Sequence, residues 1–123
     1  MKVHGREVFF LKTVGAVCDV EEHCPEHNLK NIAALMDAET TSERINGFIV
    51  IICALNKGYE EAKHYEDESY TPNPLTKEEL MHVPYDDLKE LFVEATKVFY
   101  SMDQTVEVED DPKKKEETNE TSD

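Results

Sequence analysis

The chain has 123 residues, enough for one domain, and its 28 acidic and 13 basic residues give a net charge of −15. Nucleic acids and anionic lipids carry the same sign, which argues against DNA, RNA or membrane-surface binding. The longest apolar run, residues 48–55, is too short for a membrane-spanning helix of about 20 residues. Three cysteines and no visible signal peptide predict a cytoplasmic protein with free thiols.

The first residues have the composition of a small β-hairpin. Val3 and the run 8–10 are strand formers, and Gly5 can take the positive φ that a tight turn requires. A hairpin this short is not stable alone. We therefore expect a hairpin within residues 2–11 that lies against the rest of the fold.

Two helical segments are expected on either side of Pro25. Residues 12–24 have apolar side chains at helical spacing, at Leu11, Val14, Val17 and Cys18. The residue before a proline is pushed out of the α region, so this helix should end at Cys24. Asn28 can cap the next segment, which has a short apolar stripe, at Leu29, Ile32, Ala33, Leu35 and Met36.

The longest helix is expected after Thr40, which forms an S/T-x-x-E capping box with Glu43. One apolar face runs along it, at Ile45, Phe48, Ile49, Ile52, Leu55, Tyr59 and Ala62. Residues 48–55 are apolar on all sides, which predicts burial on most sides. The β-branched run could also be a core strand, but the continuation of the face through Tyr59 and Ala62 favours a helix.

The second half of the chain predicts a loop and two further helices. Residues 65–75 contain two prolines and a charge cluster, which indicates a loop. Thr76 should cap a short helix over residues 77–83, before Pro84. The last helix has the clearest apolar periodicity, at Tyr85, Leu88, Leu91, Phe92, Ala95, Val98, Phe99 and Met102.

From residue 106 the composition changes to eight acids and three lysines with no aromatic residue. Such a segment cannot bury enough apolar surface to offset its ordering entropy, roughly 1–2 kcal/mol per residue for the backbone. The sequence therefore predicts a mainly α protein: a helical domain over residues 1–105 with an N-terminal β-hairpin, and a disordered acidic tail over residues 106–123.

One cluster has the residue types of a metal site: Cys18, His23, Cys24 and His27. Zinc sites usually combine two separated ligand pairs, and this chain has no second pair. We favour a structural interpretation, in which Cys18 packs in the core, Cys24 ends a helix, and the two histidines are solvated. No catalytic, cofactor or metal residues are assigned.

Motifs for enzymatic chemistry are also missing from the sequence. It has no Gly-rich phosphate loop, no G-x-S-x-G elbow and no H-E-x-x-H helix. The acidic clusters at 66–68 and 109–111 have the composition of solvated surface, because carboxylates need a pocket that shifts their pKa to act as general acids or bases. We expect a protein that is not an enzyme.

The order of short segments over residues 1–105 is more informative than any one motif. The segments are VHGRE (3–7), EEHCPEH (21–27), LMD (35–37), ALNKGYEEA (54–62) and LTKEEL (75–80). In this order, and followed by a charged tail, they resemble the tail assembly chaperones of long-tailed bacteriophages.

This resemblance implies a small, helical, acidic protein of the bacterial cytoplasm that binds the tape measure protein. It would keep that protein soluble while tail tube subunits polymerise, and would be absent from the finished virion. Self-association along one long client is expected. The resemblance also implies a longer frameshifted product that recruits tail tube subunits, and the lysines at 113–115 are compatible with an adenine-rich slippery codon run. A Cys/His metal-binding regulator and a structural head–tail connector component are the alternatives.

Overall fold

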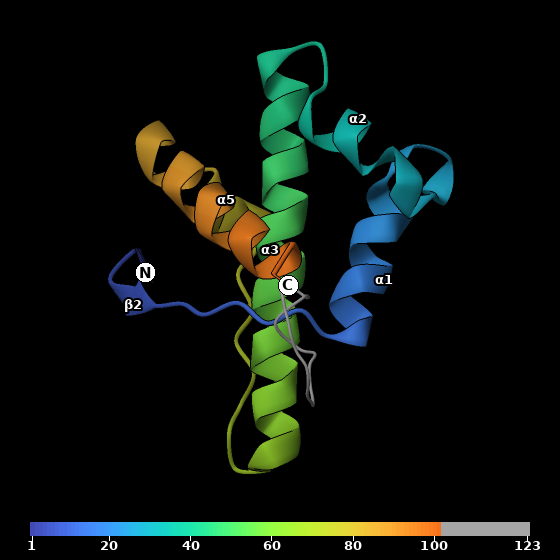
Figure 1. The fold of residues 1–123 in the computed structure, drawn as a ribbon. Helices are drawn as coiled ribbons and strands as arrows, with labels where there is room; N and C mark the ends of the chain where they lie inside the picture. The colour runs from blue at the N-terminus through green and yellow to red at the C-terminus, as the bar shows by residue number, and fades with distance from the viewer. Residues whose placement is uncertain (102–123) are drawn as a thin grey trace, which may run out of the picture.

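The computed structural model describes residues 1–101, which are mainly helical with a two-stranded hairpin at the N-terminus. This confirms the predicted fold class. The predicted acidic tail, residues 106–123, and Met102 lie outside the described residues. The central element is helix α3 (Thr41–Glu66), and helices α1 (Val14–His23) and α5 (Tyr85–Phe99) both pack against it (Figure 1). Across residues 1–101, no helix is long and apolar enough to cross a bilayer.

The hairpin consists of β1 (Lys2–Val3) and β2 (Arg6–Glu7), paired antiparallel. His4 and Gly5 form the connecting turn with φ of 49° and 85°, as the two-residue type I′ turn requires. Arg6 Nη1 donates to the carbonyl oxygen of Asn73 at 2.8 Å, which ties the hairpin to the loop after α3. The prediction of a hairpin that lies on the rest of the fold is confirmed, although its strands are shorter than residues 2–11.

Helix α1 begins after Thr13, whose hydroxyl accepts from the Ala16 backbone N–H at 3.1 Å. It ends at Cys24, before Pro25, as predicted. The predicted apolar face is correct only at Val17, which packs half-buried against the core. Helix α1 turns Ala16 and Val20 to the core and leaves Val14 83% exposed. Two causes explain this. Leu11 belongs to the extended segment before the helix, and the small Ala16 side chain allows α1 to approach Gly58 of α3 closely.

After Pro25 the chain forms two short 3₁₀ helices, η1 (Pro25–His27) and η2 (Leu29–Asn31), and then α2 (Ile32–Met36). The side chain of Asn28 accepts from the Lys30 backbone N–H at 3.0 Å, which confirms the predicted cap. The larger apolar side chains of this segment pack half-buried against the core, at Leu29, Ile32, Leu35 and Met36. Ala33, also expected in this stripe, is exposed.

Helix α3 starts with the predicted capping box, in which Glu43 N–H donates to Thr40 Oγ1 at 3.2 Å and Thr40 N–H donates to Glu43 Oε1 at 3.4 Å. The β-branched run is helix rather than strand. Its centre is buried between elements on different sides, with buried residues at Gly47, Ile49, Ile51, Ile52, Ala54, Leu55, Asn56, Gly58 and Glu60. The helix continues through Glu66, so the predicted loop at residues 65–75 begins two residues too early.

The short helix α4 (Lys77–Leu80) has a second capping box, formed by Thr76 and Glu79, and ends before residue 83. Pro84 precedes α5, whose predicted stripe is confirmed as core except at Tyr85, which is 51% exposed. The buried residues are Leu88, Leu91, Ala95 and Phe99. Phe92 of the same stripe stacks on Phe48 of α3 with ring centroids 4.0 Å apart. The stripe therefore serves mainly to hold α5 on α3.

Candidate functional site

The four Cys and His residues of the N-terminal cluster do not converge on one point. Within residues 1–101, no group of three or more His, Cys, Asp or Glu side chains is placed to hold a metal ion. Cys18 is exposed, whereas Cys24 is buried. Cys18 lies on α1, whereas Cys24 is the extended residue that ends it, and their different burial shows that the two side chains face different surroundings. The arrangement therefore does not support the metal-binding interpretation.

Each remaining member of the cluster has a local structural partner. Cys24 Sγ donates to the carbonyl oxygen of Val20 at 3.3 Å, so Cys24, and not Cys18 as predicted, is the core cysteine. Burial raises the pKa of the Cys24 thiol. His23 and His27 are exposed, as expected, and their Nδ1 atoms lie 2.9 and 2.7 Å from the carbonyl oxygens of Asp19 and Glu22.

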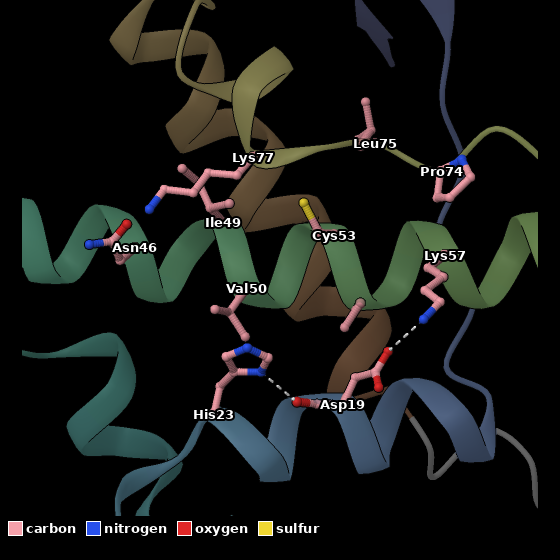
Figure 2. A pocket seen from close by; sticks show the side chains of 11 residues that line it. Asp19, His23, Asn46, Ile49, Val50, Cys53, Lys57, Pro74, Leu75 and Lys77 are labelled. Atoms are coloured by element: carbon pink, nitrogen blue, oxygen red, sulfur yellow. Dashed lines mark hydrogen bonds and ion pairs between the residues drawn. The ribbon is translucent and has the colours of Figure 1, made fainter.

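A groove of about 610 Å³ runs along α3, between α1 and the segment 74–77 (Figure 2). We call it the α3 groove. It is lined by Asp19, His23, Asn46, Ile49, Val50, Cys53, Ala54, Lys57, Pro74, Leu75 and Lys77. The floor is formed by α3 residues at helical spacing. One wall is formed by α1 and the other by the segment 74–77, which are far apart in the sequence.

The neighbouring helices do not cover the whole apolar surface of α3, and the α3 groove is the part that they leave uncovered. Helix α1 covers one side of α3, and α4 with α5 covers another. Between them, Val50 and Cys53 remain half-buried, although they belong to the all-round apolar run of the sequence. An apolar strip left between packed elements is a feature of ligand and helix-binding grooves.

The rim of the α3 groove is charged. Lys57 Nζ lies 3.8 Å from Asp19 Oδ2, and the two side chains are 47% and 40% exposed. At that distance and exposure the ion pair contributes little to stability. Lys77 at the start of α4 is also exposed and lines the same groove. The lining thus offers an apolar centre with lysines at its edge.

Cys53 contributes to the α3 groove as an apolar side chain. Burial, and then the nearby charge of Glu79, raise the pKa of its thiol to about 11. At neutral pH the thiol is therefore protonated, and a protonated thiol is a poor nucleophile and metal ligand. Cys53 therefore presents a neutral, apolar side chain to the groove.

The α3 groove was not among the features predicted from the sequence. The available signal was the all-round apolar middle of α3, which we interpreted only as burial. Comparison of the chain with protein-family models, curated proteins and solved structures finds no significant match. The functional inference therefore depends on the residues and geometry of this chain.

Proposed function

We propose that this protein is a bacteriophage tail assembly chaperone that binds apolar helical segments of the tape measure protein. The observation that carries the proposal is the α3 groove, whose apolar floor is open to solvent between α1 and the segment 74–77. The order of sequence segments that resembles these chaperones supports the same function. The protein would act in the cytoplasm of the bacterial host and would leave before the virion is complete.

The geometry suits a helix as the bound element. An amphipathic helix places side chains at i, i+3, i+4 and i+7 into a groove, and such a stripe matches the helical spacing of Val50, Cys53 and Ala54 on the floor. Long helical clients expose many apolar stripes before assembly. A cover that buries one stripe at a time and adds net negative charge would suppress their association.

The proposed role also leads us to expect two further interactions, with other copies of this chain and with tail tube subunits. Several copies would coat one long client, which is the reason to expect self-association. A longer frameshifted product would recruit tail tube subunits. The nucleotide sequence around codons 110–118 tests this second point, because slippage requires a repetitive codon run followed by an open overlapping frame.

Co-expression with the tape measure protein tests the proposal. We expect the soluble yield of the tape measure protein to rise with the wild-type chain and to fall back with Val50→Asp, which places a charge on the groove floor. Val93→Asp is the matched control, because Val93 is 49% exposed on α5, outside the groove. Circular dichroism melting of both variants checks that each is folded.

Unchanged soluble yield with the wild-type chain would contradict the chaperone function. An equal loss for Val50→Asp and Val93→Asp, with both variants folded, would instead show that the client does not use the α3 groove.

A further inference from the structure

We infer that the α3 groove selects helices whose apolar stripe is bracketed by two acidic side chains about three helical turns apart. This inference depends on the proposed function, since it names the chemistry of the client that the groove accepts. It follows from the position of two lysines relative to the apolar floor.

The lining of the α3 groove has more basic than acidic side chains. The chain has 28 acids against 13 bases, yet the lining has Lys57 and Lys77 against one carboxylate, Asp19. That carboxylate is directed at Lys57, at 3.8 Å. Over the described part of the chain, Lys77 takes part in no ion pair. Glu79, whose charge reaches Cys53, is paired with Arg6 Nη2 at 3.4 Å and does not line the groove. The lining therefore carries a net charge of +1 on an acidic protein, which favours an acidic ligand.

The two lysines are well separated along the α3 groove. Figure 2 shows Lys57 and Lys77 toward opposite ends of the α3 groove, with Lys77 toward the end where Asn46 lies. From Asn46 to Lys57 the axis of α3 rises by about 16 Å, at ~1.5 Å per residue. The apolar floor lies between these ends. A bound helix would thus meet a cation, an apolar strip and a second cation in that order.

This order of charges and apolar surface defines the kind of helix that would fit the α3 groove. Residues about eleven positions apart on a helix lie on nearly the same side, because about eleven steps of ~100° make three full turns. A client helix with acids at i and i+11, and apolar residues at i+3, i+4, i+7 and i+8, would match both lysines and the floor. The two acid–lysine contacts would fix its register, while the apolar stripe would supply most of the affinity.

Two synthetic helical peptides test this inference on the full-length protein. Both have the same apolar stripe, and they carry either glutamate or lysine at positions i and i+11. Fluorescence anisotropy at about 150 mM salt measures their affinities. We expect the glutamate peptide to bind roughly 10-fold more tightly, since two partly exposed ion pairs replace two repulsions.

The double variant Lys57→Glu with Lys77→Glu should reverse the preference. Lys30→Glu with Lys97→Glu is the matched control: it changes the net charge equally, at exposed lysines outside the α3 groove, and should keep the preference for glutamate. Equal affinity of the two peptides for the wild-type chain, or a preference that survives in the Lys57/Lys77 variant, would overturn the inference.

Other outcomes separate this inference from the proposed function. If both peptides bind equally and Val50→Asp abolishes binding, the α3 groove takes helices without charge selection: the inference fails and the chaperone function stands. If co-expression fails as well, the chaperone function itself fails. If sedimentation shows a dimer that Val50→Asp dissociates, and peptide does not compete with it, the occupant is a second copy and the inference is wrong.

Discussion

The Leu75 backbone N–H donates a hydrogen bond to the side-chain oxygen of Asn56 at 2.7 Å, and both residues are buried. The amide of Asn56 in turn donates to the Phe9 carbonyl oxygen at 3.0 Å. One side chain of α3 therefore holds the extended segment after the hairpin and the loop after α3. Because Pro74 and Leu75 form one wall of the α3 groove, Asn56 also sets the shape of that groove.

Asn56→Ala should lower the free energy of unfolding by about 2–4 kcal/mol. The change leaves the Leu75 N–H and the Phe9 carbonyl without their partner and creates a cavity, and each effect is costly in a buried site. Urea unfolding followed by circular dichroism measures the loss. Asn46→Ala, at an exposed position of the same helix, should change stability by less than about 0.5 kcal/mol. Similar losses for the two variants would contradict this assignment.

Glu60→Gln should lower the pKa of Tyr70. The Tyr70 hydroxyl donates to Glu60 Oε1 at 2.6 Å, and this bond to the carboxylate raises the pKa of Tyr70 in the wild-type chain. Glutamine keeps the hydrogen-bond acceptor but removes the charge that opposes the phenolate, so ionisation should begin at lower pH. Phenolate absorbance during a base titration measures this shift. Glu61→Gln, at the exposed neighbouring position, should leave the titration curve unchanged.

Gly58→Ala should destabilise the fold by at least about 2 kcal/mol, although alanine favours helices by ~1 kcal/mol over glycine. A Cβ at Gly58 would stand 2.6 Å from the Leu11 carbonyl oxygen, which is backbone and cannot move aside alone. Gly15→Ala is the matched test in α1, where a Cβ meets nothing closer than 3.9 Å, and it should raise the melting temperature. A stabilised Gly58→Ala variant would mean that residues 11–16, which include the start of α1, do not approach α3 this closely.

The three cysteines should react with iodoacetamide in the order of their exposure: Cys18 first, Cys53 next and Cys24 last. The raised pKa of Cys53, about 11, leaves roughly one thiol in a thousand ionised at about pH 8. Its labelling rate should therefore rise about 10-fold per pH unit until the pH approaches that value. Mass spectrometry of the labelled peptides gives the three rates. Faster labelling of Cys24 than of Cys18 would contradict the described orientation of α1.

The local signals of the sequence were reliable because each depends on neighbouring residues. The boxes formed by Thr40 with Glu43 and by Thr76 with Glu79 both cap helices, and Pro25 ends α1 at the predicted residue. A cap satisfies backbone N–H groups within one turn, so its signature needs no knowledge of the tertiary fold. The α5 stripe was equally clear, because one side of that helix packs on a single partner.

The local sequence did not determine which face of α1 is buried, nor which of Cys18 and Cys24 lies in the core. The side chains of Val14 and Cys18 have the size and polarity of core residues, but the small Ala16 and the bare Gly58 allow a closer approach on another face. Packing distance between two helices depends on both partners at once. A single-sequence periodicity cannot supply this information.

The sequence by itself determined the helical class, the capped starts of α3 and α4, the end of α1 before Pro25 and the long apolar α3, since propensity, capping and periodicity act over a few residues. Tertiary structure alone decided which strip of α3 stays open. A groove is the space that separate elements leave between them, and here α1, α3 and the segment 74–77 are brought together by contacts such as Asn56 with Leu75. Lys57 and Lys77 are twenty positions apart in the sequence, and they line the same groove only in the folded structure.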